Sequence, residues 1–231
     1  MDDFKLIYNS RAADYHRMIS AEDIDGNLLA AFQRLSALQG KRILDLGTGT
    51  GRIPLLLAGT PSRVVGFDLH AAMLHQNQIQ RKLVEGSWSL VQGDMRLLPF
   101  PRACTDITIA GWAIGHMCGW YASSWKEQIG RVLREMQRVT LPGGHLFILE
   151  TLGTGSLRPV PPAKGLADYY EWLENEWGFT RTVISTDYQF TSVEDAVHQT
   201  EFFFGPALSD RIREHQWTRL PEWTGLWTRR L

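Results

Sequence analysis

The sequence predicts an α/β fold, in which helices cover both faces of a mostly parallel sheet as a three-layer αβα sandwich. Two observations predict it. Short apolar segments of strand length alternate along the chain with longer segments of helical periodicity. A glycine-rich turn also joins the first strand to the helix after it, which is typical of parallel sheets. Since 231 residues fit one such domain with insertions, we expect a single domain over residues 1–231.

Residues 1–40 precede the glycine turn and are expected to be helical. A polar stretch over residues 9–19 is helix-like. A second helix is expected from Asn27, because apolar residues recur at helical spacing at Leu28, Leu29, Phe32, Leu35 and Leu38.

The glycine turn lies within residues 42–52. A short buried strand is followed by Gly47, Gly49 and Gly51, and then by an apolar helix over residues 52–58. Glycine lets the chain bend sharply and lets a ligand approach the main chain. The helix N-terminus offers unpaired N–H groups and a partial positive charge. The turn is therefore predicted to be a ligand-binding cradle.

The spacing of the glycines indicates which ligand fits this cradle. They run G-x-G-x-G, and Arg52 stands where the dinucleotide fingerprint G-x-G-x-x-G/A needs glycine or alanine. Asp45, two residues before the first glycine, places a carboxylate that is awkward for a pyrophosphate and suits a cationic ligand. A nicotinamide-dependent oxidoreductase stays an alternative, because Asp68 at the end of the next strand would also suit the ribose of a nicotinamide dinucleotide.

The remaining elements follow in alternation. Strands are expected over residues 63–68, 87–91, 105–111, 145–150 and 180–190, and helices over residues 71–83, 125–139, 166–177, 193–204 and 207–215. In the helix over residues 71–83, Met73, Leu74, Ile79 and Leu83 are expected to face inward. A last strand over residues 217–229 contains Pro221, which argues for an edge position or a bulge. Residues 152–178 are expected to form an insertion with a cap helix after the fifth strand.

Four stretches together, over residues 42–52, 64–68, 92–95 and 131–150, resemble the motifs of the class I S-adenosylmethionine (SAM) methyltransferases, in the expected order. The nearest grouping is the small-molecule methyltransferases that include the quinone-biosynthesis enzymes. The resemblance implies a seven-stranded, Rossmann-like sheet with an antiparallel last strand. It also implies SAM as the cofactor and S-adenosylhomocysteine as the product, formed when a small-molecule acceptor attacks the sulfonium methyl group in line.

The resemblance also assigns the cofactor-binding residues. Asp68 would accept hydrogen bonds from the ribose hydroxyls, although an aspartate there also suits a helix N-cap. Asp94 would accept from the adenine amino group, although Gly93 permits a solvated turn instead. The other candidates are Asp45, Gly47, Thr48 and Gly49 for the methionine part, Leu69 beside the ribose, Met95 beside the adenine, and the backbone of Ala110 and Gly111 at the methionine end.

The loop after the fourth strand is expected to face the transferred methyl group. His116 could take a proton from the acceptor, and Trp112, Trp120 and Tyr121 could wall a flat or cationic acceptor. The alternative is a packing histidine among core aromatics. At the N-terminus, Tyr8, Ala12 and Tyr15 form a Tyr-x-x-x-Ala-x-x-Tyr pattern that resembles the lid of similar enzymes; an ordinary packing helix is the alternative. Residues 1–40 are thus expected to supply lid helices.

Composition excludes other classes of function. The net charge is −1 without a basic run, which argues against nucleic acid as a partner. The loop after the fourth strand also lacks the Asn/Asp-Pro-Pro-Tyr and Pro-Cys elements of nucleic-acid methyltransferases, since Cys118 follows Met117.

The two cysteines have no metal-ligand spacing, so no metal is expected. Without a signal peptide or a membrane-length apolar run, a cytoplasmic location is expected. Besides the oxidoreductase, a non-catalytic SAM-binding module stays an alternative.

Overall fold

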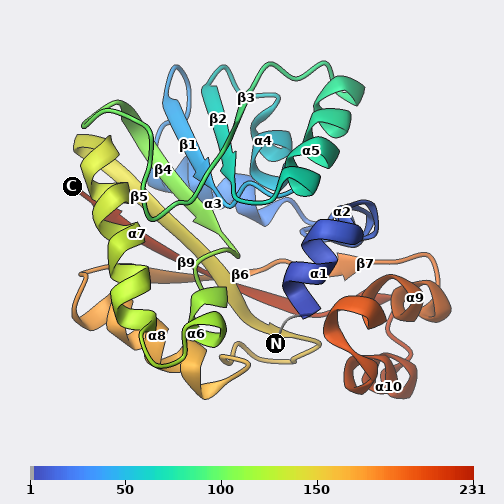
Figure 1. The fold of residues 1–231 in the computed structure, drawn as a ribbon. Helices are drawn as coiled ribbons and strands as arrows, with labels where there is room; N and C mark the ends of the chain where they lie inside the picture. Colours follow the sequence, from blue (N-terminus) through green and yellow to red (C-terminus); the bar gives the residue numbers. More distant parts are fainter. Residues whose placement is uncertain (1–2) are drawn as a thin grey trace.

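The computed structural model describes residues 3–231, apart from the side chains of Asp3 and Lys5. Its main element is a seven-stranded sheet (Figure 1). In spatial order the strands are β3 (Ser89–Gln92), β2 (Arg63–Asp68), β1 (Arg42–Leu46), β4 (Thr105–Gly111), β5 (Thr140–Thr154), β9 (Glu222–Arg230) and β6 (Thr180–Ser185). Neighbours from β3 to β5 are parallel, and β9 is antiparallel to both β5 and β6. The predicted seven-stranded, mostly parallel sheet with an antiparallel last strand is confirmed.

Helices cover both faces of this sheet, as predicted. On one face α3 (Asn27–Leu35) and α4 (Arg52–Leu57) pack against the strands, and α5 (Ala71–Leu83) packs against β2 and β3. On the other face lie α6 (His116–Trp120), α7 (Trp125–Val139) and α8 (Lys164–Asn175). Helices can pack on both faces because β5 carries apolar side chains on each face. Leu146 and Ile148 pack on the α7 side, and Phe147 and Leu149 pack on the α3 side.

A smaller group of elements lies beside the sheet. It comprises α1 (Asp3–Ser10), α2 (Ala12–Ile19), α9 (Val193–Phe204), α10 (Pro206–His215) and a hairpin of β7 (Tyr188–Gln189) with β8 (Arg219–Leu220) (Figure 1). The polar stretch over residues 9–19 thus belongs to two helices, because Arg11 leaves helical geometry with φ −127° and ψ 30°. Buried side chains from α2, α9, α10 and the hairpin form a separate apolar cluster, so this group has a core of its own.

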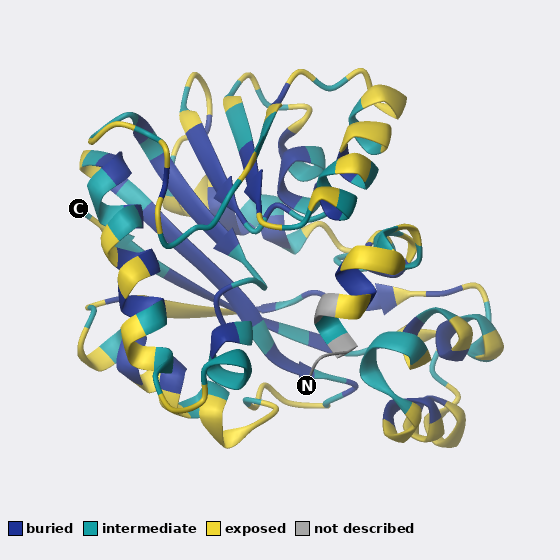
Figure 2. Ribbon diagram, in the orientation of Figure 1, coloured by how far each residue is buried: buried dark blue, intermediate teal, exposed yellow. Residues whose placement is uncertain are grey.

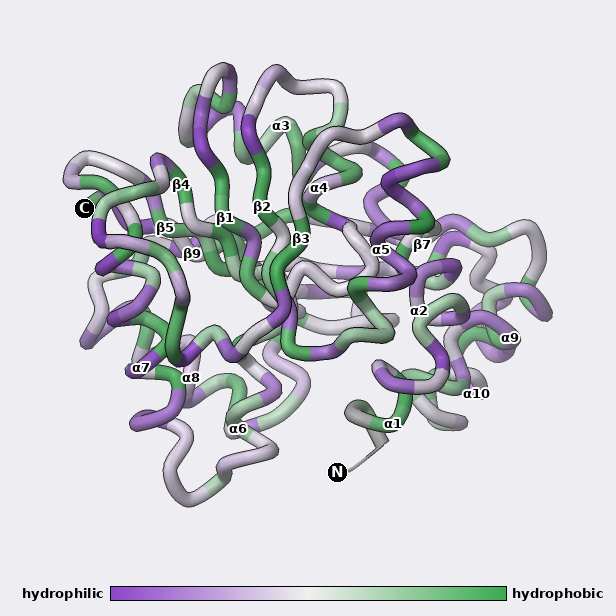
Figure 3. The backbone as a smooth tube through the Cα atoms, turned by 45° about the horizontal axis from the view of Figure 1, so that its top comes forward, coloured by the Kyte–Doolittle hydropathy of each residue, from purple (hydrophilic) through white to green (hydrophobic). Residues whose placement is uncertain are grey.

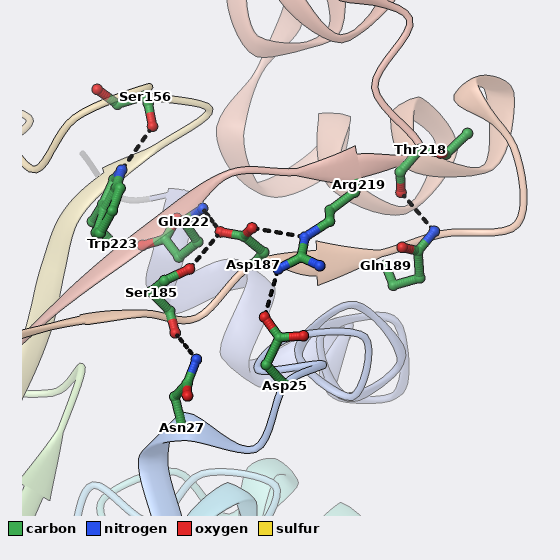
Figure 4. Close-up of polar contacts among 10 residues, drawn as sticks. All are labelled: Asp25, Asn27, Ser156, Ser185, Asp187, Gln189, Thr218, Arg219, Glu222 and Trp223. Atoms are coloured by element: carbon green, nitrogen blue, oxygen red, sulfur yellow. Dashed lines mark hydrogen bonds and ion pairs between the residues drawn. The ribbon is translucent and has the colours of Figure 1, made fainter. Parts of the chain in front are cut away.

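One aspartate joins the hairpin to the main sheet (Figure 4). The carboxylate of Asp187 accepts hydrogen bonds from the Ser185 hydroxyl and the Glu222 backbone N–H, both at 3.0 Å. It also pairs with Nε of Arg219 at 2.9 Å, and Arg219 Nη2 reaches Asp25 at 2.5 Å. Asp187 and its partner Arg219 therefore connect four segments, namely the end of β6, the start of β9, β8 and the segment before α3.

Two sequence predictions about packing are wrong. Pro221 does not mark an edge strand, because it lies between β8 and β9, outside the ladder that places β9 in the sheet interior. The bulge alternative agrees with the register shift between Thr151 and Thr154 of β5, where Thr154 pairs with Glu222, the residue after Pro221. Ile79 and Leu83 do not face inward, since they are 40% and 73% exposed. The inward stripe of α5 runs through Met73 and the fully buried Asn77 instead, and a polar residue in that stripe misleads a count of apolar positions.

Burial follows the layers. Figure 2 shows the strands buried along most of their length and the outward turns of the helices exposed. Figure 3 shows the same contrast in hydropathy, with hydrophobic residues along β1 and β2 and largely hydrophilic residues on α5. Among residues 3–231, no helix combines the length and the apolar character needed to cross a membrane.

Candidate functional site

A cavity of about 820 Å³, counted up to its open mouth, lies at the carboxyl ends of β1, β2 and β4. Ligands of open parallel sheets bind at this edge, where neighbouring crossovers diverge. Most of the candidate residues from the sequence line the cavity, namely Tyr8, Tyr15, Gly47, Gly49, Asp68, Leu69, Asp94, Met95, Gly111, Trp112, His116, Trp120 and Tyr121.

Three candidates, Asp45, Thr48 and Ala110, are buried behind the lining. Ala110 is in the interior of β4, and Thr48 fills the space beside Gly66. Neither oxygen of Asp45 has a hydrogen-bond partner among the described residues. Burial raises the pKa of Asp45 to about 7, and nearby Asp68 adds to the rise, while the Thr48 side chain partly offsets it. Asp45 is thus a buried acidic group directly before the glycine turn, without a cationic partner among the described residues.

The glycine turn is held in a conformation that other residues rarely adopt. Gly47 and Gly51 have φ of +68° and +103°. A Cβ on Gly47 would lie 2.4 Å from Cβ of Ala113, so the turn packs directly against the loop after β4. Asn77 fixes the turn from α5, since its Nδ2 donates to the Gly49 carbonyl at 3.1 Å. Sequence reasoning missed Asn77; the signal was a polar amide within the apolar stripe of its helix.

Asp68 connects the turn to the end of β2. Its Oδ2 accepts from the Gly49 N–H and its Oδ1 from the His70 N–H, both at 2.8 Å. The N-cap of α5 is His70, so the helix N-cap alternative for Asp68 is wrong. Burial raises the pKa of Asp68, and the hydrogen bonds from His70 and Gly49 oppose that rise. Each carboxylate oxygen keeps a lone pair with which it could accept from a ligand.

Asp94 is already engaged by an arginine. Nε of Arg96 contacts both carboxylate oxygens at 3.0 Å, and Nη2 reaches Oδ2 at 2.6 Å. This bidentate pair lowers the pKa of Asp94. Arg96 also lines the cavity and donates to Gln128 of α7 at 2.7 Å. Arg96 was not among the sequence candidates, although the Asp-x-Arg spacing could have indicated it.

His116 lines the cavity beside the N-terminal helix α1. Its Nε2 is 2.8 Å from the Tyr8 hydroxyl, and its ring stacks on Trp120 at 5.1 Å between centroids. Burial lowers the pKa of His116 to about 4, and His70 nearby lowers it further, whereas a hydrogen bond to the Trp112 backbone opposes the shift. Burial raises the pKa of Tyr8, so its hydroxyl keeps its proton and donates to the neutral Nε2, a tautomer assigned from these partners.

Aromatic side chains of the N-terminal helices close this side of the cavity. The rings of Tyr8 and Tyr15 meet edge to face at 5.6 Å. Tyr15 contacts Phe203 of α9 at 5.4 Å, and Phe4 contacts both Phe203 and His116 at 5.0 and 5.2 Å. Phe4 and Phe203 were missed, because nothing in the sequence indicates that α9 backs the N-terminal helices. Helix α8, expected as part of a cap, packs on the sheet and contributes no lining residue.

Comparison with known proteins agrees with this architecture. Residues 44–148 match the family model of the methyltransferase domain named Methyltransf_11. The chain is 32% identical over 167 residues to a malonyl-[acyl-carrier protein] O-methyltransferase of Legionella pneumophila, which covers 71% of this chain and 54% of that protein. It is 34% identical over 124 residues to the ubiquinone/menaquinone biosynthesis C-methyltransferase UbiE of Syntrophotalea carbinolica, and this match covers 53% of this chain and 48% of that protein. The chain spans about half the length of these curated relatives.

Solved structures share the fold. A SAM-dependent methyltransferase from Aquifex aeolicus superposes with a TM-score of 0.53 at 14% identity, covering 87% of this chain and 89% of that one. The [4+2]-cyclase SpnF gives 0.54 at 20% identity, covering 87% and 79%. At these identities the likeness concerns the fold alone. Together, the sheet order, the motif positions and the family match show that residues 44–148 form a methyltransferase domain with a Rossmann-like fold, the fold that SAM-dependent methyltransferases share.

Proposed function

We propose that this chain binds SAM in the cavity and transfers its methyl group to a small-molecule acceptor. The observation that carries the proposal is that acidic side chains at the glycine-turn end of the cavity lack cationic partners. Asp68 and the nearby Asp45 have no cationic side chain as a hydrogen-bond partner among the described residues, and the guanidinium of Arg96 is taken up by Asp94. SAM carries a sulfonium and an ammonium group against one carboxylate. A dinucleotide would instead bring a doubly negative pyrophosphate to this end.

The lining residues fit the parts of SAM. Asp68 would accept from the two ribose hydroxyls with its remaining lone pairs, and Met95 and Asp94 would flank the adenine. Gly47, Gly49 and the end of β4 would approach the methionine part with their main chain. This division is supported by the fact that Gly47, Gly49, Asp68, Asp94 and Met95 all line one continuous cavity at the sheet edge.

The contribution of the protein to the reaction is mainly alignment. SAM supplies an activated methyl group, so the chain needs to hold donor and acceptor in line and to exclude water, which can contribute about 7–11 kcal/mol. Tyr8 and Tyr15 would serve as the lid over the acceptor, with residues 1–40 as the lid segment of a single domain. His116, with its pKa near 4, is a weak base. It would accept the acceptor's proton at Nε2 only after Tyr8 yields that position.

Calorimetric titration with SAM, S-adenosylhomocysteine and NAD tests the cofactor. Asp68→Ala removes two charge-assisted hydrogen bonds to ribose, each worth about 1.5–3 kcal/mol, so we expect at least a tenfold loss of SAM affinity. Asp106→Ala is the matched control, because Asp106 pairs with Arg42 at the opposite end of β1 and β4. Equal SAM affinity in wild type and Asp68→Ala would refute the ribose assignment, and binding of NAD alone would indicate an oxidoreductase.

Turnover tests methyl transfer itself. Production of S-adenosylhomocysteine is measured with a malonyl thioester and with intermediates of quinone biosynthesis, classes suggested by the names of two relatives. Acceptor-dependent product would reject the non-catalytic binding module. Tight SAM binding with no product across a broad acceptor panel would favour that module instead.

A further inference from the structure

Arg52 contacts two segments that are far apart in the sequence. It is the first residue of α4, directly after the glycine turn. Its Nη2 lies 2.6 Å from Oε1 of Glu22, which belongs to the segment between α2 and α3. Its guanidinium carbon lies 3.4 Å from the centre of the Trp112 ring, in the loop after β4. The side chains of Arg52 and Glu22 are only 15% and 2% exposed, so solvent screens this pair weakly.

Other buried polar groups lie beside the pair. Burial together with the negative charge of Glu22 raises the pKa of Glu222 of β9, and the positive charge of Arg52 opposes that rise. Oε1 of Glu222 accepts from the Thr151 hydroxyl at 2.8 Å. Arg52 and Glu22 thus form a buried ion pair, and removing either partner would leave the other without its counter-charge.

Trp112 is the member of this group that reaches the cavity. It adopts φ +50°, a conformation that is uncommon for a bulky residue and persists only when its surroundings impose it. Its N–H donates to the Leu149 carbonyl at 2.7 Å. Arg52 packs on the indole ring. The orientation of Trp112 in the cavity wall thus depends on its contact with Arg52.

We propose that Arg52 is a positioning residue that couples the N-terminal lid to the acceptor wall of the cavity. Through Glu22 it anchors the chain that leaves α2, the helix carrying Tyr15, and through its planar face it holds Trp112. Arg52 does not line the cavity, so it acts on the acceptor only through these neighbours. The role of Trp112 as an acceptor wall rests on the function proposed above, whereas the mechanical coupling does not.

Three variants separate the two contacts. Glu22→Gln keeps the shape of Glu22 but removes its charge, so it weakens the anchor of α2. Arg52→Lys keeps a charge for Glu22 but loses the planar group that stacks on Trp112. Arg52→Met removes both contacts. Arg42→Met is the matched control, because Arg42 forms an exposed pair with Asp106 at the far end of the sheet.

Hydrogen exchange of the ligand-free protein is the readout, followed over residues 12–26 and residues 112–117. We expect exchange roughly tenfold faster over residues 12–26 alone in Glu22→Gln, over residues 112–117 alone in Arg52→Lys, and over both in Arg52→Met. Arg42→Met should leave both segments unchanged. With a working acceptor, Arg52→Lys should raise the acceptor KM more than it lowers kcat.

Two results would overturn the coupling. One is unchanged exchange in both segments of Glu22→Gln and Arg52→Lys. The other is an equal increase in every segment, including β1 and β4, because that pattern indicates a purely structural role. Titration of wild type with S-adenosylhomocysteine is run alongside. Failure of that titration would refute the proposed cofactor but not the coupling, which is measured without ligand.

Discussion

The hydroxyl of Tyr8 lies 2.8 Å from Nε2 of His116, so the first helix is hydrogen-bonded to the loop that follows the fourth strand. Both side chains line the cavity. The N-terminal helix therefore occupies the proton-accepting atom of the histidine nearest the expected methyl acceptor. An acceptor hydroxyl or amine could take the place of Tyr8 at that atom.

Tyr8→Phe should lower stability by about 1 kcal/mol, because it leaves the buried Nε2 of His116 without a donor. Urea unfolding at pH 7 measures the change. Tyr121→Phe is the control, since Tyr121 lines the same cavity but is only partly buried. Equal unfolding midpoints for wild type and Tyr8→Phe would mean that this hydrogen bond does not hold the helix in place.

Gly47→Ala should abolish cofactor binding. The added methyl would lie 2.4 Å from Cβ of Ala113 at a φ of +68°, so the turn and the loop after β4 would have to move apart. Calorimetry with S-adenosylhomocysteine measures the loss, and thermal unfolding checks that the variant is folded. Gly59→Ala is the matched control, because a Cβ at Gly59 meets nothing within 4 Å among the described residues. Wild-type affinity in Gly47→Ala would show that the turn adapts.

Glu150→Gln should flatten the pH dependence of stability. Glu150 of β5 accepts from the Gly115 N–H at 2.7 Å, and burial raises its pKa to about 8. A carboxyl with a raised pKa binds more protons when folded, so its contribution to stability falls as pH rises from about 4.5 to 8 and is constant above that range. Each pKa unit corresponds to about 1.4 kcal/mol, so the total reaches a few kcal/mol.

Gln can still accept from Gly115 but cannot ionise. The difference in unfolding free energy between Glu150→Gln and wild type should therefore grow in favour of the variant from pH 5 to pH 8. Urea unfolding at four pH values in that range measures it. A difference that is independent of pH would mean that Glu150 is ionised throughout. The comparison isolates Glu150 because Glu222, whose pKa is also raised, is common to both proteins.

SAM binding should release a proton near pH 7. Asp45 has a pKa of about 7, so it is partly protonated, and a bound cation beside it would lower that pKa. Titrations in buffers of different ionisation enthalpy give the number of protons released. We expect Asp45→Asn to bind SAM with close to no proton release. The same number of protons released by Asp45→Asn and wild type would mean that another group is responsible.

Much of the fold followed from local sequence patterns. The buried strand, the glycine turn and the next helix are contiguous, so the local pattern of residues 42–58 was enough to predict them. Asp68 was found because it directly follows an apolar strand and therefore lies at the sheet edge. Pro221 shows the limit of such arguments. Its local chemistry favours a break in pairing, but only the position of β9 between β5 and β6 reveals that the break lies outside the sheet.

The sequence by itself determined the α/β class, the strand ends that surround the cavity and most of its candidate residues, because period-two and helical patterns depend on neighbours along the chain. Only the tertiary structure decided which side chains meet. The Tyr8–His116 bond joins residues 108 positions apart, and Arg52, Glu22 and Trp112 come from three separate segments. No local pattern records such contacts, since they arise from how the layers pack and from the need of each buried polar group for a partner.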